Sequence, residues 1–158
     1  MARAGMLGGL ALWAALSAFG GSAWAQACAP VVGRVVSVEG SVEIQGEGEP
    51  GWRSAGPDEP LCRLHAIRTG RLSRAAVALA NDEVLRLDQE SVVRLADINE
   101  EAGERSLIEL VFGAFYSFSR RPHQIDVRTT HMNLAIRGTE FQVRAEAGQS
   151  LLTVLEGR

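Results

Sequence analysis

The chain has 158 residues, of which 46% are hydrophobic and 22% charged, which suits one domain with a buried core rather than two large ones. Its 19 acidic residues outnumber its 16 lysines and arginines, and all 16 are arginine. This acidic balance gives no electrostatic reason to bind nucleic acid or an anionic membrane surface, so no nucleic-acid partner is expected.

The N-terminus has the pattern of a secretory signal peptide. Arg3 precedes the apolar run AGMLGGLALWAALSAFGG, and Ala-Trp-Ala follows at residues 23–25. A basic start, an apolar middle and an A-x-A ending predict cleavage before Gln26. An uncleaved membrane anchor is the alternative, but the Gly and Ala content makes the run only weakly hydrophobic. We therefore expect a signal peptide over residues 1–25 and a periplasmic or secreted domain over residues 26–158.

Two cysteines, Cys28 and Cys62, fall in the part of the chain that is expected to be exported. Because exported proteins meet an oxidising environment, a disulfide between them is the favoured expectation. Closing a loop of this size would add roughly 3–4 kcal/mol of stability in the chain-entropy model. Two free thiols are the alternative, since pairing cannot be deduced from sequence alone.

Beyond the cysteine at position 28, the sequence alternates between short strand patterns and turns. Residues 31–45 are rich in valine and end in a period-two alternation of apolar and polar residues. Residues 46–60 are rich in Gly, Pro and acids, which predicts a loop with Trp52 held in place. Asn81-Asp82 predicts a tight hairpin turn, because both residues tolerate positive φ. Further strands are expected at 75–80, 83–87, 91–96, 107–112, 114–118, 124–128, 131–145 and 151–156.

Many short strands at regular spacing predict an all-β fold in a single compact domain, with a sandwich, a barrel or a β-solenoid as the candidate architectures. A helix is the alternative for residues 72–79, where alanine is frequent.

No motif of the chain points to catalysis or to a cofactor. Residues 46–51 formally match G-x-G-x-x-G, but two glutamates and a proline occupy the turn that would have to receive a pyrophosphate. His65, His123 and His131 form no H-x-x-x-H or H-x-H pair, so a zinc site would have to be assembled from distant residues. No G-x-S-x-G elbow supports a nucleophilic serine. The expectation is a protein that is not an enzyme and that holds no metal or cofactor.

One basic cluster, Arg120-Arg121 followed by Pro122, stands out. The guanidinium fork suits a phosphate or carboxylate partner. Ordinary surface charge is the favoured alternative.

Gly138 stands inside the alternating stretch HMNLAIRGTEFQVRA, where a glycine needs a local reason. Glycine weakens a strand, because it has the most conformational freedom to lose and no side chain to pack. We expect a bend or a close approach of another backbone here, with Thr139 satisfying a freed backbone group. Ile136 and Phe141 are expected to flank the step in the core, and exposure of Arg137 for recognition is the alternative role.

Short motifs run in order along the expected mature chain, and any one of them would be weak by itself. They are Val32-Gly33-Arg34-Val35, Val38-Glu39-Gly40-Ser41-Val42, Trp52, Ile67-Arg68-Thr69-Gly70, Ser73-Arg74-Ala75, Leu85-Arg86-Leu87, Ile108-Glu109-Leu110-Val111-Phe112-Gly113-Ala114, Val127-Arg128-Thr129-Thr130, Ile136-Arg137-Gly138-Thr139-Glu140-Phe141-Gln142-Val143 and Val154-Leu155-Glu156-Gly157. In this order they resemble the FecR-type periplasmic domain family over essentially all of the mature chain.

The resemblance implies a domain that senses or relays signals in the bacterial envelope through protein–protein contact. The partner it implies is an envelope protein, such as an outer-membrane receptor or a membrane regulator. A structural or carbohydrate-associated envelope module is the alternative.

The chain departs from the family pattern at three places. The family usually has a Gly-Asp pair where Leu64-His65 stand here, so the turn before Ile67 is expected to be built differently. Family members that regulate iron uptake carry a cytoplasmic anti-sigma segment, whereas only Met-Ala-Arg precedes the apolar run of this sequence, so sigma-factor binding is not expected. The family pattern also continues into further strand beyond Glu156-Gly157-Arg158, which predicts a truncated or minimal C-terminal end.

Overall fold

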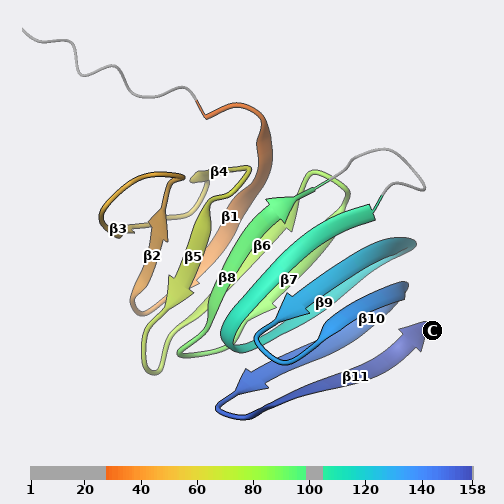
Figure 1. The fold of residues 1–158 in the computed structure, drawn as a ribbon. Helices are drawn as coiled ribbons and strands as arrows, with labels where there is room; N and C mark the ends of the chain where they lie inside the picture. The colour runs from red at the N-terminus through yellow and green to blue at the C-terminus, as the bar shows by residue number, and fades with distance from the viewer. Residues whose placement is uncertain (1–27, 99–104, 158) are drawn as a thin grey trace, which may run out of the picture.

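The computed structural model describes residues 28–98 and 105–157, which form eleven β-strands (Figure 1). The expected all-β fold is therefore confirmed. Within these ranges there is no helix of the length and apolarity that a membrane crossing needs. The expected signal peptide, residues 1–25, lies outside the described residues. The strands are β1 (Val31–Glu39), β2 (Val42–Gln45), β3 (Arg53–Ser54), β4 (Pro60–Cys62), β5 (Ala66–Thr69), β6 (Arg74–Leu79), β7 (Glu83–Leu87), β8 (Val92–Asp97), β9 (Arg105–Thr129), β10 (Asn133–Glu146) and β11 (Gln149–Gly157).

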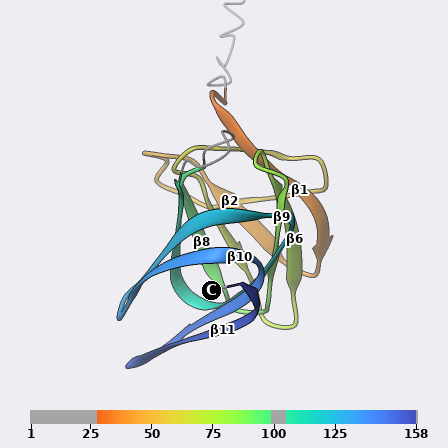
Figure 2. The ribbon, with the colours of Figure 1, turned by 90° about the vertical axis from the view of Figure 1, so that its right-hand side faces the viewer.

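All eleven strands belong to one sheet, which curls back on itself (Figure 2). Hydrogen-bonded neighbours follow the order β3-β2-β5-β8-β9-β7-β6-β1-β4, while β10 pairs with β9 and β11 pairs with β10. All the pairings are antiparallel. Short connections require this of consecutive strands such as β6–β7 and β10–β11. The architecture is thus a single curled open sheet in one compact domain.

β9 is the central strand and is longer than the sequence predicted. The three separate strands expected at 107–112, 114–118 and 124–128 fall within its 25 residues. Its first part pairs with β8 and residues 115–119 pair with β7. Gly113, with φ +89°, lies between these parts, and a Cβ added there would come within 2.5 Å of Ser91 Cα. The glycine therefore allows a bend that lets one strand serve successive neighbours.

β6 occupies most of the stretch for which a helix was the alternative. Its burial alternates residue by residue, with Ala75, Val77 and Leu79 buried and the residues between them more exposed. That period of two is a strand pattern, so the helical alternative is wrong. The expected turn at Asn81-Asp82 follows at once and leads into β7, with Asp82 at φ 64°.

The core consists of the inward-facing residues of the curled sheet. Val35, Val77 and Leu85 are fully buried on neighbouring strands, which shows how the period-two alternation of each strand supplies one row of the core. Phe115 of β9 and Phe141 of β10 meet edge to face, with ring centroids 6.1 Å apart. This aromatic pair anchors the β9–β10 hairpin on the rest of the sheet.

Candidate functional site

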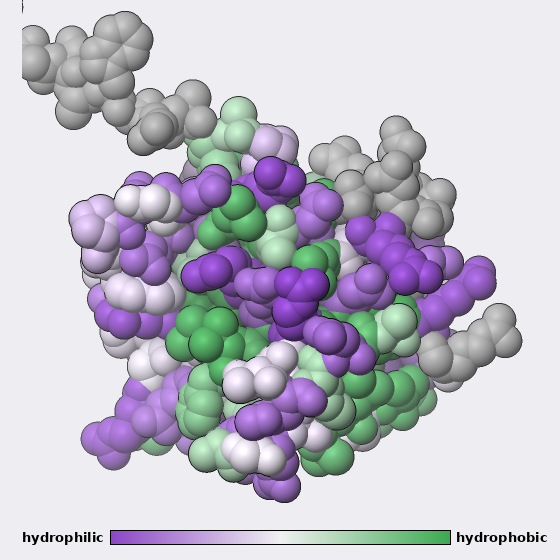
Figure 3. Space-filling view, viewed as in Figure 1, coloured by the Kyte–Doolittle hydropathy of each residue, from purple (hydrophilic) through white to green (hydrophobic). Residues whose placement is uncertain are grey.

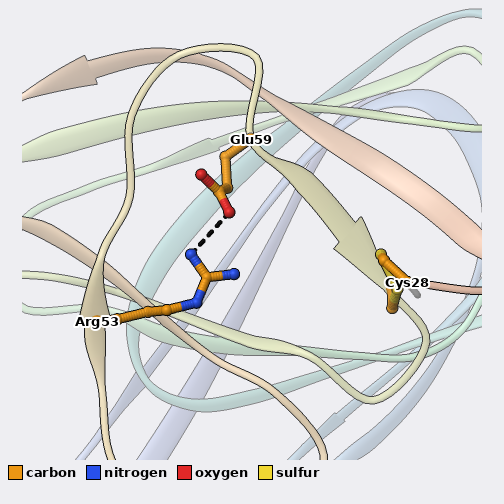
Figure 4. The surroundings of a disulfide bond; sticks show 4 residues. Cys28, Arg53 and Glu59 are labelled. Atoms are coloured by element: carbon orange, nitrogen blue, oxygen red, sulfur yellow. Dashed lines mark hydrogen bonds and ion pairs between the residues drawn. A yellow bond between two sulfur atoms is a disulfide. The ribbon is translucent and has the colours of Figure 1, made fainter. Parts of the chain in front are cut away.

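The predicted cysteine pair lies at one corner of the sheet. Cys28 and Cys62 are joined by a disulfide with a Cα–Cα distance of 5.4 Å, which ties the segment before β1 to β4 (Figure 4). His65 follows β4, and burial is the main cause that lowers the pKa of its imidazole, against weaker opposing effects of Glu49 and Glu59. The Arg53–Glu59 ion pair, 2.7 Å long, lies beside this corner.

The family motif Ile67-Arg68-Thr69-Gly70 connects distant parts of the sheet. Ile67 is buried in the core. The Arg68 guanidinium bonds Glu43 at 2.7 Å and lies 4.4 Å from the ring centroid of Trp52, so it holds the 46–52 loop. Thr69 Oγ1 donates to Asp88 O and accepts from Ser91 N. These contacts give the motif a structural role.

The Arg-Gly-Thr step has both a distorted backbone and a close approach of another strand, the two reasons considered for its glycine. Four residues of β9, 119–122, stand opposite Thr139 alone, so the backbone bulges. A Cβ on Gly138 would also lie 2.5 Å from Glu156 O, and a Cβ on Gly157 would lie 2.5 Å from Gly138 Cα. The two glycines therefore allow the backbones of β10 and β11 to touch.

The residues around that step divide between the core and the surface. Ile136 and Phe141 are buried, whereas Arg137 is exposed. The role expected of Thr139 is wrong, because its Oγ1 is buried and has no hydrogen-bond partner among the described residues. A shallow hollow of about 360 Å³ opens beside the step, between Arg137 and Glu156.

The outer edge of β11 has no partner strand among the described residues. Among the described strands β11 pairs with β10 alone, through eight of its nine residues. Leu151, Val154 and Leu155 are 60%, 39% and 59% exposed, and hydrophobic surface gathers where Figure 1 places the β10–β11 hairpin (Figure 3). Glu156 is the one charged residue of the strand. The strands at the two ends of the main path, β3 and β4, have only two and three residues. Proteins usually protect a sheet edge by keeping its strand short or by placing charged side chains along it. β11 is long and has one charged residue, so it has little of this protection.

A buried glutamate is a feature that the sequence analysis missed. Glu83 begins β7, is 1% exposed, and accepts a short hydrogen bond from Ser117 Oγ. Burial raises the pKa of its carboxyl to about 7, against the opposing effect of hydrogen bonds from Ser117 and Asn81. The signal was present in Glu83-Val84-Leu85-Arg86-Leu87, because a period of two places Glu83 on the same face as two leucines.

The Arg120-Arg121 cluster lies in the bulge of β9. Both side chains are exposed, and with Arg86 and Phe118 they line a hollow on the outer face of the sheet. The hollow also includes Asp82, so its charge is mixed rather than purely basic.

Comparison with known proteins gives one match. No curated protein and no solved structure is similar to the chain. The family model described as FecR protein matches residues 65–158, which is more than half of the sequence. The matched segment contains both the Ile67-Arg68-Thr69-Gly70 turn and the step at Gly138. The chain therefore belongs to the FecR family of signalling-related envelope domains.

Proposed function

We propose that this domain is exported and relays a signal by contact with another envelope protein, a membrane regulator or an outer-membrane receptor, and that it is not an enzyme. The family supports a signalling-related role in general. We propose that the contact surface is the outer edge of β11. Its side chains are uncharged from Gln149 to Leu155.

The observation that carries this proposal is the length and apolarity of that edge. An edge strand presents a row of backbone N–H and C=O groups that another extended segment can complete. Leu151 and Leu155 stand exposed along it and supply apolar contacts for the side chains of such a segment. Backbone pairing gives affinity in this binding mode, and the side chains give specificity.

Photo-crosslinking in living cells tests the surface directly. A photoreactive amino acid in place of the exposed Thr153 of β11 is expected to give an adduct with one envelope protein of defined mass. The same replacement at Val36 is the matched control, because Val36 is 54% exposed on β1, which has β6 on one side and residues 58–59 on the other at this point. Leu151→Lys and Leu155→Lys are each expected to reduce the adduct at 153, since charges protect sheet edges.

Two outcomes would contradict the proposal. One is an adduct pattern that is the same from positions 153 and 36, which would show that β11 is not special. The other is the absence of any protein adduct from position 153 together with co-sedimentation of the domain with cell-wall material. That second result would favour the structural or carbohydrate-associated alternative.

Export itself has a separate test. The mature protein is expected to begin at Gln26, because Ala23 and Ala25 supply the small residues that signal peptidase requires before its cleavage site. Intact mass of the protein recovered from the periplasm measures this directly. A mass that includes Met1 and the apolar run would show a retained anchor instead.

A further inference from the structure

Three potential metal ligands converge at the disulfide corner. One ligand atom from each of Cys28, Cys62 and His65 lies within 4.8 Å of the other two. Cys62 is 7% exposed, and the Nδ1 atom of His65 is buried without a hydrogen-bond partner among the described residues. A buried imidazole nitrogen with no partner is unusual, because burying a polar atom without a hydrogen bond costs free energy.

The backbone holds the histidine in this place. Leu64 has φ 65°, which turns the chain sharply between β4 and β5 and brings residue 65 back beside Cys62. The His65 backbone N–H donates to Cys62 O at 3.1 Å, and Leu95 N–H donates to His65 O at 3.0 Å. The imidazole therefore projects from a turn that the sheet fixes on two sides.

We propose that reduction of the Cys28–Cys62 disulfide creates a binding site for one thiophilic metal ion of the Zn²⁺ class, with the two cysteine sulfurs and an imidazole nitrogen of His65 as ligands. A dithiol reductant supplies two electrons and two protons, and the disulfide becomes two thiols while the reductant becomes a disulfide. The metal ion then replaces the two thiol protons, which pass to solvent. A metal-mediated link between the N-terminal segment and β4 thus takes the place of the covalent one.

The geometry suits such an ion. Zn–S and Zn–N bonds of about 2.3 and 2.0 Å in a tetrahedral site place the ligand atoms roughly 3.5–3.8 Å apart. A ligand atom of His65 lies within 4.8 Å of both sulfurs, not far from this spacing. The sulfurs are now bonded to each other, and a Cα–Cα distance of 5.4 Å lets them separate once that bond is broken. Two thiolates and an imidazole with a fourth position open to water form a recognised zinc ligand set.

Metal titration of the reduced full chain tests the proposal. The protein is reduced with a phosphine, freed of reductant without oxygen, and titrated with Co²⁺, which reports thiolate ligands by a charge-transfer absorption band. One equivalent is expected to bind, Zn²⁺ is expected to displace it, and Zn²⁺ is expected to raise the melting temperature of the reduced chain. The oxidised chain is expected to show no Co²⁺ band and no rise in melting temperature with Zn²⁺.

Variants separate this site from adventitious binding. Cys62→Ser is expected to abolish the charge-transfer band, and His65→Gln to weaken binding by roughly 100-fold or more, since loss of a hydrogen-bond partner of a ligand alone costs about 10–100-fold. His131→Gln, a change at an exposed histidine, is the matched control and is expected to bind as wild type. Melting of oxidised His65→Gln checks its fold. Unchanged affinity in His65→Gln, equal binding by the oxidised chain, or binding without a rise in melting temperature would overturn the proposal.

Discussion

Replacing Gly138 with valine is expected to lower the free energy of unfolding by about 2–4 kcal/mol, measured with the disulfide intact. A Cβ at this position would lie 2.5 Å from Glu156 O and 3.0 Å from Gly157 Cα. Both atoms belong to the backbone of β11, so no side-chain rotation relieves the overlap. The strand itself must move away, and its pairing with β10 must weaken.

Gly51→Val is the matched control for this change. Gly51 has no atom within 4 Å of an added Cβ, so the same substitution meets open space there. Chemical denaturation is expected to show a lower free energy of unfolding for Gly138→Val than for Gly51→Val. Relative to wild type, Gly138→Val is also expected to speed hydrogen exchange in β11 more than in β6. Equal stability of Gly138→Val and wild type would mean that the contact between Gly138 and Gly157 does not constrain the fold.

The same glycine pair connects stability to the proposed function. Because Gly138 and Gly157 set how closely the end of β11 lies on β10, they position the edge that is proposed to bind a partner. Gly138→Val is therefore also expected to weaken the crosslink from position 153. The family motifs at the Arg-Gly-Thr step and at Glu156-Gly157 are far apart in the sequence, yet they meet at this single backbone contact.

Local pattern was sufficient for much of the fold. Alternation of apolar and polar residues located β6, β7, β8, β10 and β11, and the tolerance of Asn and Asp for positive φ located the turn before β7. It missed the short strands β3, β4 and β5, the first of which lies inside the loop expected at 46–60. The same reasoning divided β9 into three, because Gly113 and the 119–122 bulge interrupt the alternation without ending the strand. A break in a pattern does not show whether the chain turns away or only bends.

The candidate sites depended on contacts that no local pattern contains. Cys28, Cys62 and His65 meet only because β4 is brought beside β1 and the chain turns sharply at Leu64. That β11 pairs with β10 alone among the described strands is likewise a property of the whole sheet order. The unpartnered hydroxyl of Thr139 lies opposite the bulge of β9, which no pattern within residues 131–145 announces.

The second large effect is expected from Glu83, whose contribution to the free energy of unfolding should fall as the pH rises toward neutrality. Its carboxyl is 1% exposed, and no ion pair among the described residues involves it. It is hydrogen-bonded to Ser117 Oγ and lies 3.5 Å from Asn81 Nδ2, both of them neutral groups. Burial without a counter-charge favours the protonated acid, which raises the pKa from 4.5 to about 7.

The sign follows from proton linkage. A group whose pKa is higher in the folded than in the unfolded state binds its proton more tightly in the folded state. Glu83 therefore contributes stability that is complete below the unfolded pKa of 4.5 and disappears as the pH rises through about 7. The contribution of this one carboxyl is expected to fall by roughly 2–3 kcal/mol between pH 5 and pH 8.

Glu83→Gln isolates this contribution, because the amide keeps a similar shape and stays neutral at every pH. The free energy of unfolding of Glu83→Gln minus that of wild type is expected to increase by roughly 2–3 kcal/mol from pH 5 to pH 8. Other titrating groups act in both proteins and cancel in the difference. Glu39→Gln makes the same chemical change at an exposed position of β1 and controls for the loss of a carboxylate. If the difference between Glu83→Gln and wild type were constant over this range, Glu83 would have to be ionised in the folded state. The cluster around Ser117 would then have to stabilise a buried charge, which two neutral hydrogen-bond donors do not readily do.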